Sequence, residues 1–184
     1  FTLMFAFSIQ SQVIITEIAD PNNDSQARFI ELTNIGDNAF DLTGYQLVRW
    51  TNANTAYTSS SAVDLSEFGS LQSKGILTLA NNTNFETVYG VAPTKVIGSS
   101  GPADSNGDDN IAILDPNGGI YDVYGVPGTD GTGQPHEFED GRAERKGSVT
   151  APSSTWDLNE WNIDKDAGAG DGALDAPSGY DPGS

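Results

Sequence analysis

Short runs in which apolar and polar residues alternate, separated by turn-forming residues, recur along most of this chain. In residues 45–50, Tyr45, Leu47 and Arg49 share one face, and the residues between them share the other. Alternation over about four to eight residues predicts a half-buried β-strand. The predicted strands cover residues 13–18, 29–34, 45–50, 76–80, 94–97, 111–114, 120–124, 142–146 and 160–163.

Turn signals separate nearly all of these runs. The first run ends at Asp20-Pro21-Asn22-Asn23, where proline presets φ and asparagine tolerates left-handed backbone. One short helix is predicted at residues 84–89, with no helical crossover between successive strands. The sequence therefore predicts an all-β fold, an antiparallel β-sandwich of about 7–10 short strands.

Composition and charge exclude several classes of function. A chain of 184 residues with 36% hydrophobic residues is long enough for one domain with its own core. Its net charge of -18 opposes binding to nucleic acid or to an anionic bilayer by this domain alone. The chain has no cysteine and a single histidine, His136, which excludes cysteine nucleophiles and two-histidine metal motifs. We expect His136 to be a surface loop residue without a catalytic role.

The two ends differ from the body of the chain. Residues 1–11 are uncharged and begin with an apolar run, which indicates the later part of a secretory signal peptide cleaved after Ser11. The alternative is an edge strand at residues 1–9. From about residue 164 the chain becomes an acidic, glycine-rich arm or the start of a linker. An exported domain without disulfides is typical of bacteria, so we expect a secreted or cell-surface bacterial protein with no membrane insertion after signal cleavage.

Several segments, taken in order, resemble the lamin tail domain, an immunoglobulin-like β-sandwich. Residues 142–145 and 160–161 are similar to forms found at the front of bacterial extracellular proteins, some of which carry a secreted nuclease domain downstream. The resemblance implies a non-catalytic module and no required cofactor. The chain has no heptad rod, prenylation signal or basic surface, so filament assembly and chromatin binding are not implied. The segments that carry the resemblance are residues 14–18, 29–36, 41–47, 71–80, 108–115 and 119–125.

Three residues within this pattern carry structural predictions. Glu31 lies inside an apolar strand, so a buried side chain at this position needs a backbone donor or an arginine partner. Gly36 and Gly44 follow strands at tight corners, where we expect positive φ.

Two acidic segments are candidate cation sites. Asp104, Asn106 and Asp108 place oxygen atoms at alternate positions, as a calcium loop does, although the sixth position is occupied by Asp109 where an EF-type loop needs glycine. The second candidate lies in the glycine-rich arm, and the alternative there is a solvated acidic tail. Its predicted Ca²⁺ ligands are Asp164, Asp166, Asp171 and Asp175.

Three functions remain open at this stage. The first is a binding, tethering or localising module whose partner is an unknown protein or glycan at the cell surface. The second is the N-terminal accessory domain of a secreted metal-dependent nuclease or phosphoesterase whose catalytic domain lies beyond residue 184. The third is a carbohydrate-binding or Ca²⁺-dependent adhesion module. Trp50, Trp156 and Trp161 would form its stacking platform, although aromatic residues in a sandwich more often belong to the core.

Overall fold

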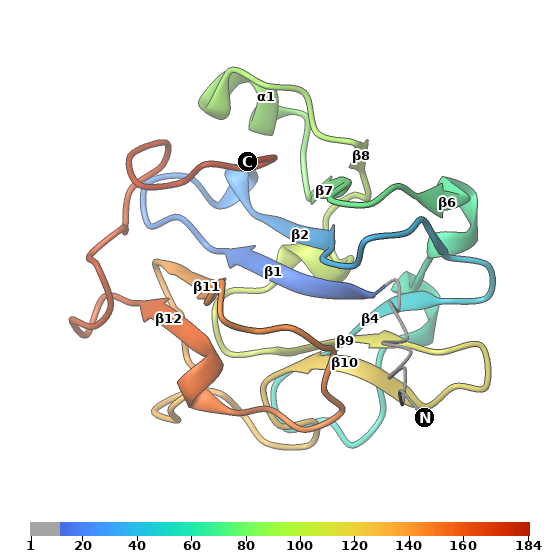
Figure 1. Ribbon diagram of the computed structural model, residues 1–184. Coiled ribbons are helices and arrows are strands. Elements are labelled where there is room, and N and C mark those ends of the chain that lie inside the picture. Colours follow the sequence, from blue (N-terminus) through green and yellow to red (C-terminus); the bar gives the residue numbers. More distant parts are fainter. Residues whose placement is uncertain (1–11) are drawn as a thin grey trace, which may run out of the picture.

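The computed structural model describes residues 12–184, so the predicted signal segment at residues 1–11 lies outside the described residues. Two main sheets face each other (Figure 1). The larger has the strand order β12-β11-β1-β2-β7-β8, the smaller has the order β10-β9-β4-β5, and β3 pairs with β6. The strands are β1 Val13–Ala19, β2 Phe29–Asn34, β3 Phe40–Asp41, β4 Gln46–Trp50, β5 Val63–Asp64, β6 Ser70–Leu71, β7 Ile76–Ala80, β8 Lys95–Val96, β9 Asn110–Leu114, β10 Ile120–Tyr124, β11 Arg142–Arg145 and β12 Trp161–Asp164.

The predicted fold class is confirmed, and each predicted run overlaps a strand. The structure adds β3, β5 and β6, which have two residues each and are too short for alternation to reveal. The expectation of no helical crossover is wrong at one point. Helix α1 (Asn84–Tyr89) lies between β7 and β8, and these two strands pair in parallel because a crossover connection joins them.

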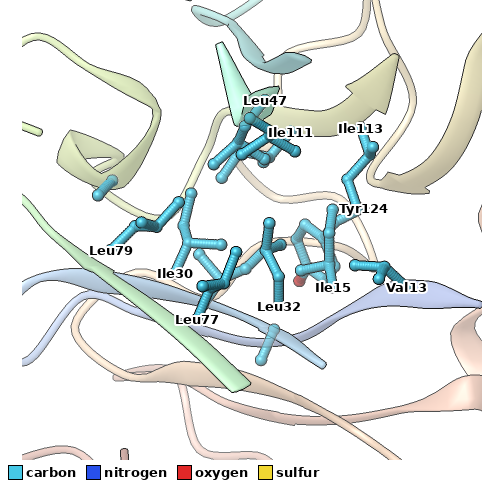
Figure 2. Close-up of a cluster of buried hydrophobic side chains, with 14 of the residues drawn as sticks. Val13, Ile15, Ile30, Leu32, Leu47, Leu77, Leu79, Ile111, Ile113 and Tyr124 are labelled. Atoms are coloured by element: carbon cyan, nitrogen blue, oxygen red, sulfur yellow. The ribbon is translucent and has the colours of Figure 1, made fainter. Parts of the chain in front are cut away.

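The core lies between the two sheets, as Figure 2 shows. Val13 and Ile15 of β1 point toward it, as do alternate residues of β2 and β7, because successive side chains of a strand point to opposite faces. From the smaller sheet, Leu47, Ile111 and Ile113 meet them (Figure 2). Each sheet also carries a further apolar cluster on part of its outer face. The central strands β1 and β9 are therefore buried on both sides.

A β-bulge interrupts strand β1. Ile15 pairs with Leu32 and Glu17 with Glu31, so Thr16 is the extra residue. A bulge places two successive residues of one strand opposite a single residue of its partner. As a result Glu17 takes the outer face of the sheet, beside Glu31, while Ile18 returns to the core.

The C-terminal arm folds back onto the larger sheet. Figure 1 shows it returning over β2 in red. Tyr180 is buried against Phe29 of β2 and Phe85 of α1, and the backbone N–H of Gly183 donates to Glu31 (2.7 Å). The arm therefore packs against the larger sheet through both apolar and hydrogen-bond contacts.

Other local features follow from the backbone. Gly44 has a φ of 81°, as predicted, whereas Gly36 does not have positive φ, so that prediction is wrong. Within residues 12–184, no helix is both long and apolar enough to cross a membrane.

Candidate functional site

A row of three glutamates crosses the outer face of the six-stranded sheet. Glu17 of β1 lies opposite Glu31 of β2 on one side and opposite Glu144 of β11 on the other. Thr78 and Asn162 continue the row into β7 and β12. Like charges directly opposite one another on neighbouring strands are destabilising, so this row needs a compensating cation or a proton.

Arg142 of β11 is the cation within the row. Its guanidinium lies 3.3 Å from Glu17, 3.3 Å from Glu144, 3.2 Å from Asp164 and 3.8 Å from Asp181 of the arm. Burial by itself lowers the pKa of Arg142, but the neighbouring carboxylates Glu17 and Glu144 outweigh this effect and raise it. Arg142 therefore faces four acidic side chains, and Arg145 adds a second guanidinium to the lining of the recess over the row.

A recess of about 210 Å³ lies over the row. Its wall includes Glu31, which accepts hydrogen bonds from the Thr16 hydroxyl (2.7 Å) and from the Gly183 backbone N–H (2.7 Å). Burial raises the pKa of Glu31, although these hydrogen bonds oppose the shift. The prediction that a buried Glu31 takes a backbone donor is confirmed.

Glu17 is a strongly perturbed carboxyl group of the row. Burial raises its pKa to about 8, Arg142 opposes the shift, and the neighbouring Glu31 and Asp181 add to it. A buried carboxyl group among other carboxylates favours its neutral form. Chemically, then, Glu17 can exchange a proton near neutral pH, and the recess offers acidic oxygens to a ligand.

The first predicted cation loop does not converge on one point. The Asp104 carboxylate accepts hydrogen bonds from the Ser100 backbone N–H (2.7 Å) and from other protein donors. Asn106 is exposed, and Asp108 accepts from the Asn52 side-chain amide (3.0 Å). Asp104 and Asp108 thus accept hydrogen bonds from different local donors, although Oδ1 of Asp108 is buried without a hydrogen-bond partner in the described part of the chain.

The acidic residues of the arm are also held apart. Asp164 is buried against Arg142, and Asp166 is exposed. Asp171 accepts from a side-chain amide of β12 (2.8 Å), and Asp175 accepts from one in the turn after β1 (3.1 Å). Across residues 12–184, no group of three or more His, Cys, Asp or Glu residues is placed to hold a metal ion.

His136 does not lie on the surface as predicted. Only 2% of it is exposed, its ring packs edge-on against Trp156, and its backbone carbonyl accepts a hydrogen bond from the Tyr124 hydroxyl (2.7 Å). Burial lowers its pKa, so the ring is neutral near pH 7. The core assignment of the tryptophans is confirmed for Trp50 and Trp161, while Trp156 is partly buried.

The glutamate row was missed at the level of the sequence, although one signal points to it. In residues 13–18 the alternation fails at Thr16-Glu17, two consecutive polar residues between Ile15 and Ile18. Such a break in an otherwise apolar strand is typical of a bulge. The partners of Glu17 carry no comparable signal, because Arg142 lies 125 residues away.

The two facing sheets and the buried layer between them define an immunoglobulin-like β-sandwich. The family model described as Lamin Tail Domain matches residues 8–128, and the chain belongs to this family. A comparison with curated proteins finds no match. The family match ends soon after β10, so Glu17 and Glu31 lie inside it, whereas Arg142 and Glu144 lie beyond it.

Proposed function

We propose that this domain is a non-catalytic binding module that tethers or localises an exported bacterial protein. Lamin tail domains form a non-catalytic family of immunoglobulin-like domains, which supports a binding role over a reaction. The partner is a protein or glycan at the cell surface, and no cofactor is required.

The observation that carries this proposal is how the fold uses its charged side chains. All four arginines form ion pairs within the domain: Arg28 with Asp20, Arg49 with Asp109, Arg142 with Glu17 and Arg145 with Asp122. The single histidine is buried and neutral. These groups stabilise the sandwich, and the acidic residues that remain on its surface suit recognition.

Secretion of a fusion protein tests the proposal. A fluorescent protein fused to residues 12–184 behind a complete signal peptide is expressed in a bacterium, beside the fluorescent protein that carries the same signal peptide alone. We expect the fusion to stay on the cell or its matrix while the control is released into the medium. Added unlabelled domain should displace the fusion, because specific binding is saturable.

Each result has a defined meaning. Equal release of both proteins overturns the tethering role. Retention that survives excess unlabelled domain also overturns it, because such retention is not specific. Hydrolysis of nucleic acid or of phosphodiesters by the purified chain would contradict the non-catalytic assignment.

A further inference from the structure

A groove of about 480 Å³ lies between the edge strands of the two sheets. Val63 and Asp64 of β5 line one side, and Lys95 and Val96 of β8 line the other. Val63 and Ile97 also pack against the core cluster, so they form an apolar base. The volume lies within the range of about 300–1,000 Å³ that is typical of ligand sites.

Both edges direct backbone groups away from their sheets. The backbone N–H of Ile97 donates to β7 (2.8 Å), so the preceding residue, Val96, turns its own N–H and C=O outward. In the same way Leu65 donates to the residue before β4 (2.9 Å), and the N–H of Asp64 points away from that strand. Outward backbone groups of an edge strand are a template to which another strand can add.

The side chains around the groove favour an extended segment that carries apolar residues. Val91 and Val96, on either side of the turn that leads into β8, are two of the four large hydrophobic side chains exposed in residues 12–184. In an extended segment beside β8, every second side chain would face the apolar base at Val63 and Ile97. The groove thus offers main-chain hydrogen bonds together with one apolar contact surface.

The charge of the groove and of the domain favours a basic segment. Lys95 is paired with Glu67 at 2.5 Å, whereas Asp64 has no ion pair within the described part of the chain. All four arginines pair with acidic side chains of the fold, and the domain as a whole carries a net charge of -18. A partner that carries Lys or Arg is therefore attracted at long range and complements the edge at short range.

We propose that the groove between β5 and β8 binds an extended segment of a partner protein that alternates apolar residues with Lys or Arg, and that this segment adds as a strand beside β8. The proposal rests on the binding role proposed above and names the class of partner.

Selection from a phage-displayed library of random linear nine-residue peptides, with the full chain as bait, tests it. We expect enrichment of sequences that alternate apolar residues with Lys or Arg. The affinity of a synthetic peptide from that set is then measured by calorimetry at 20 and 300 mM NaCl. Because charge pairing is screened by salt, Kd should rise by about fivefold or more at the higher concentration.

Two variants locate the site. Val96→Pro removes the outward N–H, and the double variant Asp64→Asn, Glu67→Gln removes charge while Asn can still cap the following turn. Each variant should raise the Kd for the peptide by about tenfold, which corresponds to about 1.4 kcal/mol of binding free energy. The matched control, Asp37→Asn with Glu86→Gln, removes two exposed carboxylates outside the groove lining and should leave Kd within about twofold. Thermal unfolding checks that each variant is folded.

Two outcomes overturn the proposal. One is enrichment of peptides without Lys or Arg, or no enrichment at all. The other is unchanged affinity in the double variant, which keeps the test decisive even where Val96→Pro fails to fold. If the secreted fusion is retained on cells and either outcome is found, the groove proposal fails while the binding function stands. Equal release of the fusion overturns the binding function itself.

Discussion

The carboxylate of Asp122 in β10 accepts a hydrogen bond of 2.8 Å from the backbone N–H of Ile15 in β1, and so connects the two sheets. It also pairs with Arg145 of β11 (3.1 Å) and accepts from the Ser153 backbone N–H (2.9 Å). The side chains of Asp122 and Arg145 are 0% and 1% exposed. This buried ion pair links β1, β10 and β11 next to the bulge at Thr16.

Asp122→Asn is expected to destabilise the domain strongly. The variant removes one of the two carboxylates that pair with the buried Arg145, the other being Glu160 at 2.6 Å, and breaking a buried pair from one side costs up to about 3–5 kcal/mol. Urea unfolding should show this loss with an unchanged m-value. Asp37→Asn, at an exposed position, should change stability by no more than about 0.5 kcal/mol. A loss below about 1 kcal/mol in Asp122→Asn would contradict the role of the pair.

Stability is expected to fall as the pH rises from about 5 to 8. Burial raises the pKa of Glu17 from 4.5 to about 8 and that of Asp20 from 3.8 to about 6. The folded protein therefore keeps protons that the unfolded chain releases above about pH 4–5. The stabilising contribution is complete below the unfolded pKa values and is lost by the time the pH passes the folded values.

Thermal unfolding between pH 5 and 9 measures this dependence. Tm of the wild-type chain should decrease across the range, and Glu17→Gln should remove most of the decrease between pH 6 and 8. Glu144→Gln removes a partly exposed carboxylate from the same row, and its Tm should still decrease with pH as that of the wild type does. An identical pH profile in the wild type and Glu17→Gln would contradict the assignment to Glu17.

Tyr180 is expected to hold the C-terminal arm on the sheet. Its ring lies in the apolar cluster that contains Phe29 and contacts the ring of Tyr89, and its hydroxyl donates to the carbonyl of Ala173 (3.1 Å) or Leu174 (3.2 Å). Tyr180→Ala should cost about 3 kcal/mol, as truncation of a buried aromatic ring does. Tyr180→Phe keeps the ring and should cost about 1 kcal/mol. Wild-type stability in Tyr180→Ala, measured by urea unfolding, would show that the arm does not contribute to the fold.

Calcium is expected to leave stability unchanged once ionic strength is matched. Asp104, Asp108, Asp171 and Asp175 each accept from a different donor, and residues 12–184 hold no group of three or more acidic or histidine side chains placed around a metal ion. Tm should agree within about 1 °C between millimolar CaCl₂ and EDTA, because only a ligand that binds the native state raises stability. A rise specific to Ca²⁺ would restore the cation-site prediction.

The misses in the sequence analysis have a common physical origin. His136 lies in a segment rich in turn residues, and its burial depends on contact with Trp156, 20 positions further along the chain. The spacing of Asp164 and Asp175 matched a calcium loop. In the structure, however, Asp164 forms an ion pair with Arg142, and Asp175 accepts a hydrogen bond from the turn after β1. Spacing along a chain restricts which groups can meet only where the intervening backbone is regular.

Alternation of apolar and polar residues was sufficient to predict the longer strands and the sandwich, because side-chain direction in a strand is a local property. The burial of Glu31 beneath the C-terminal arm depends on tertiary contacts. Composition was sufficient to exclude cysteine chemistry and to indicate an acidic surface. Which strands become neighbours was decided only in the tertiary structure. The row of Glu31, Glu17 and Glu144, its ion-pair partner Arg142 and the groove between β5 and β8 all depend on that pairing. They join segments far apart in sequence, whose contacts follow from the packing of the whole core rather than from any local pattern.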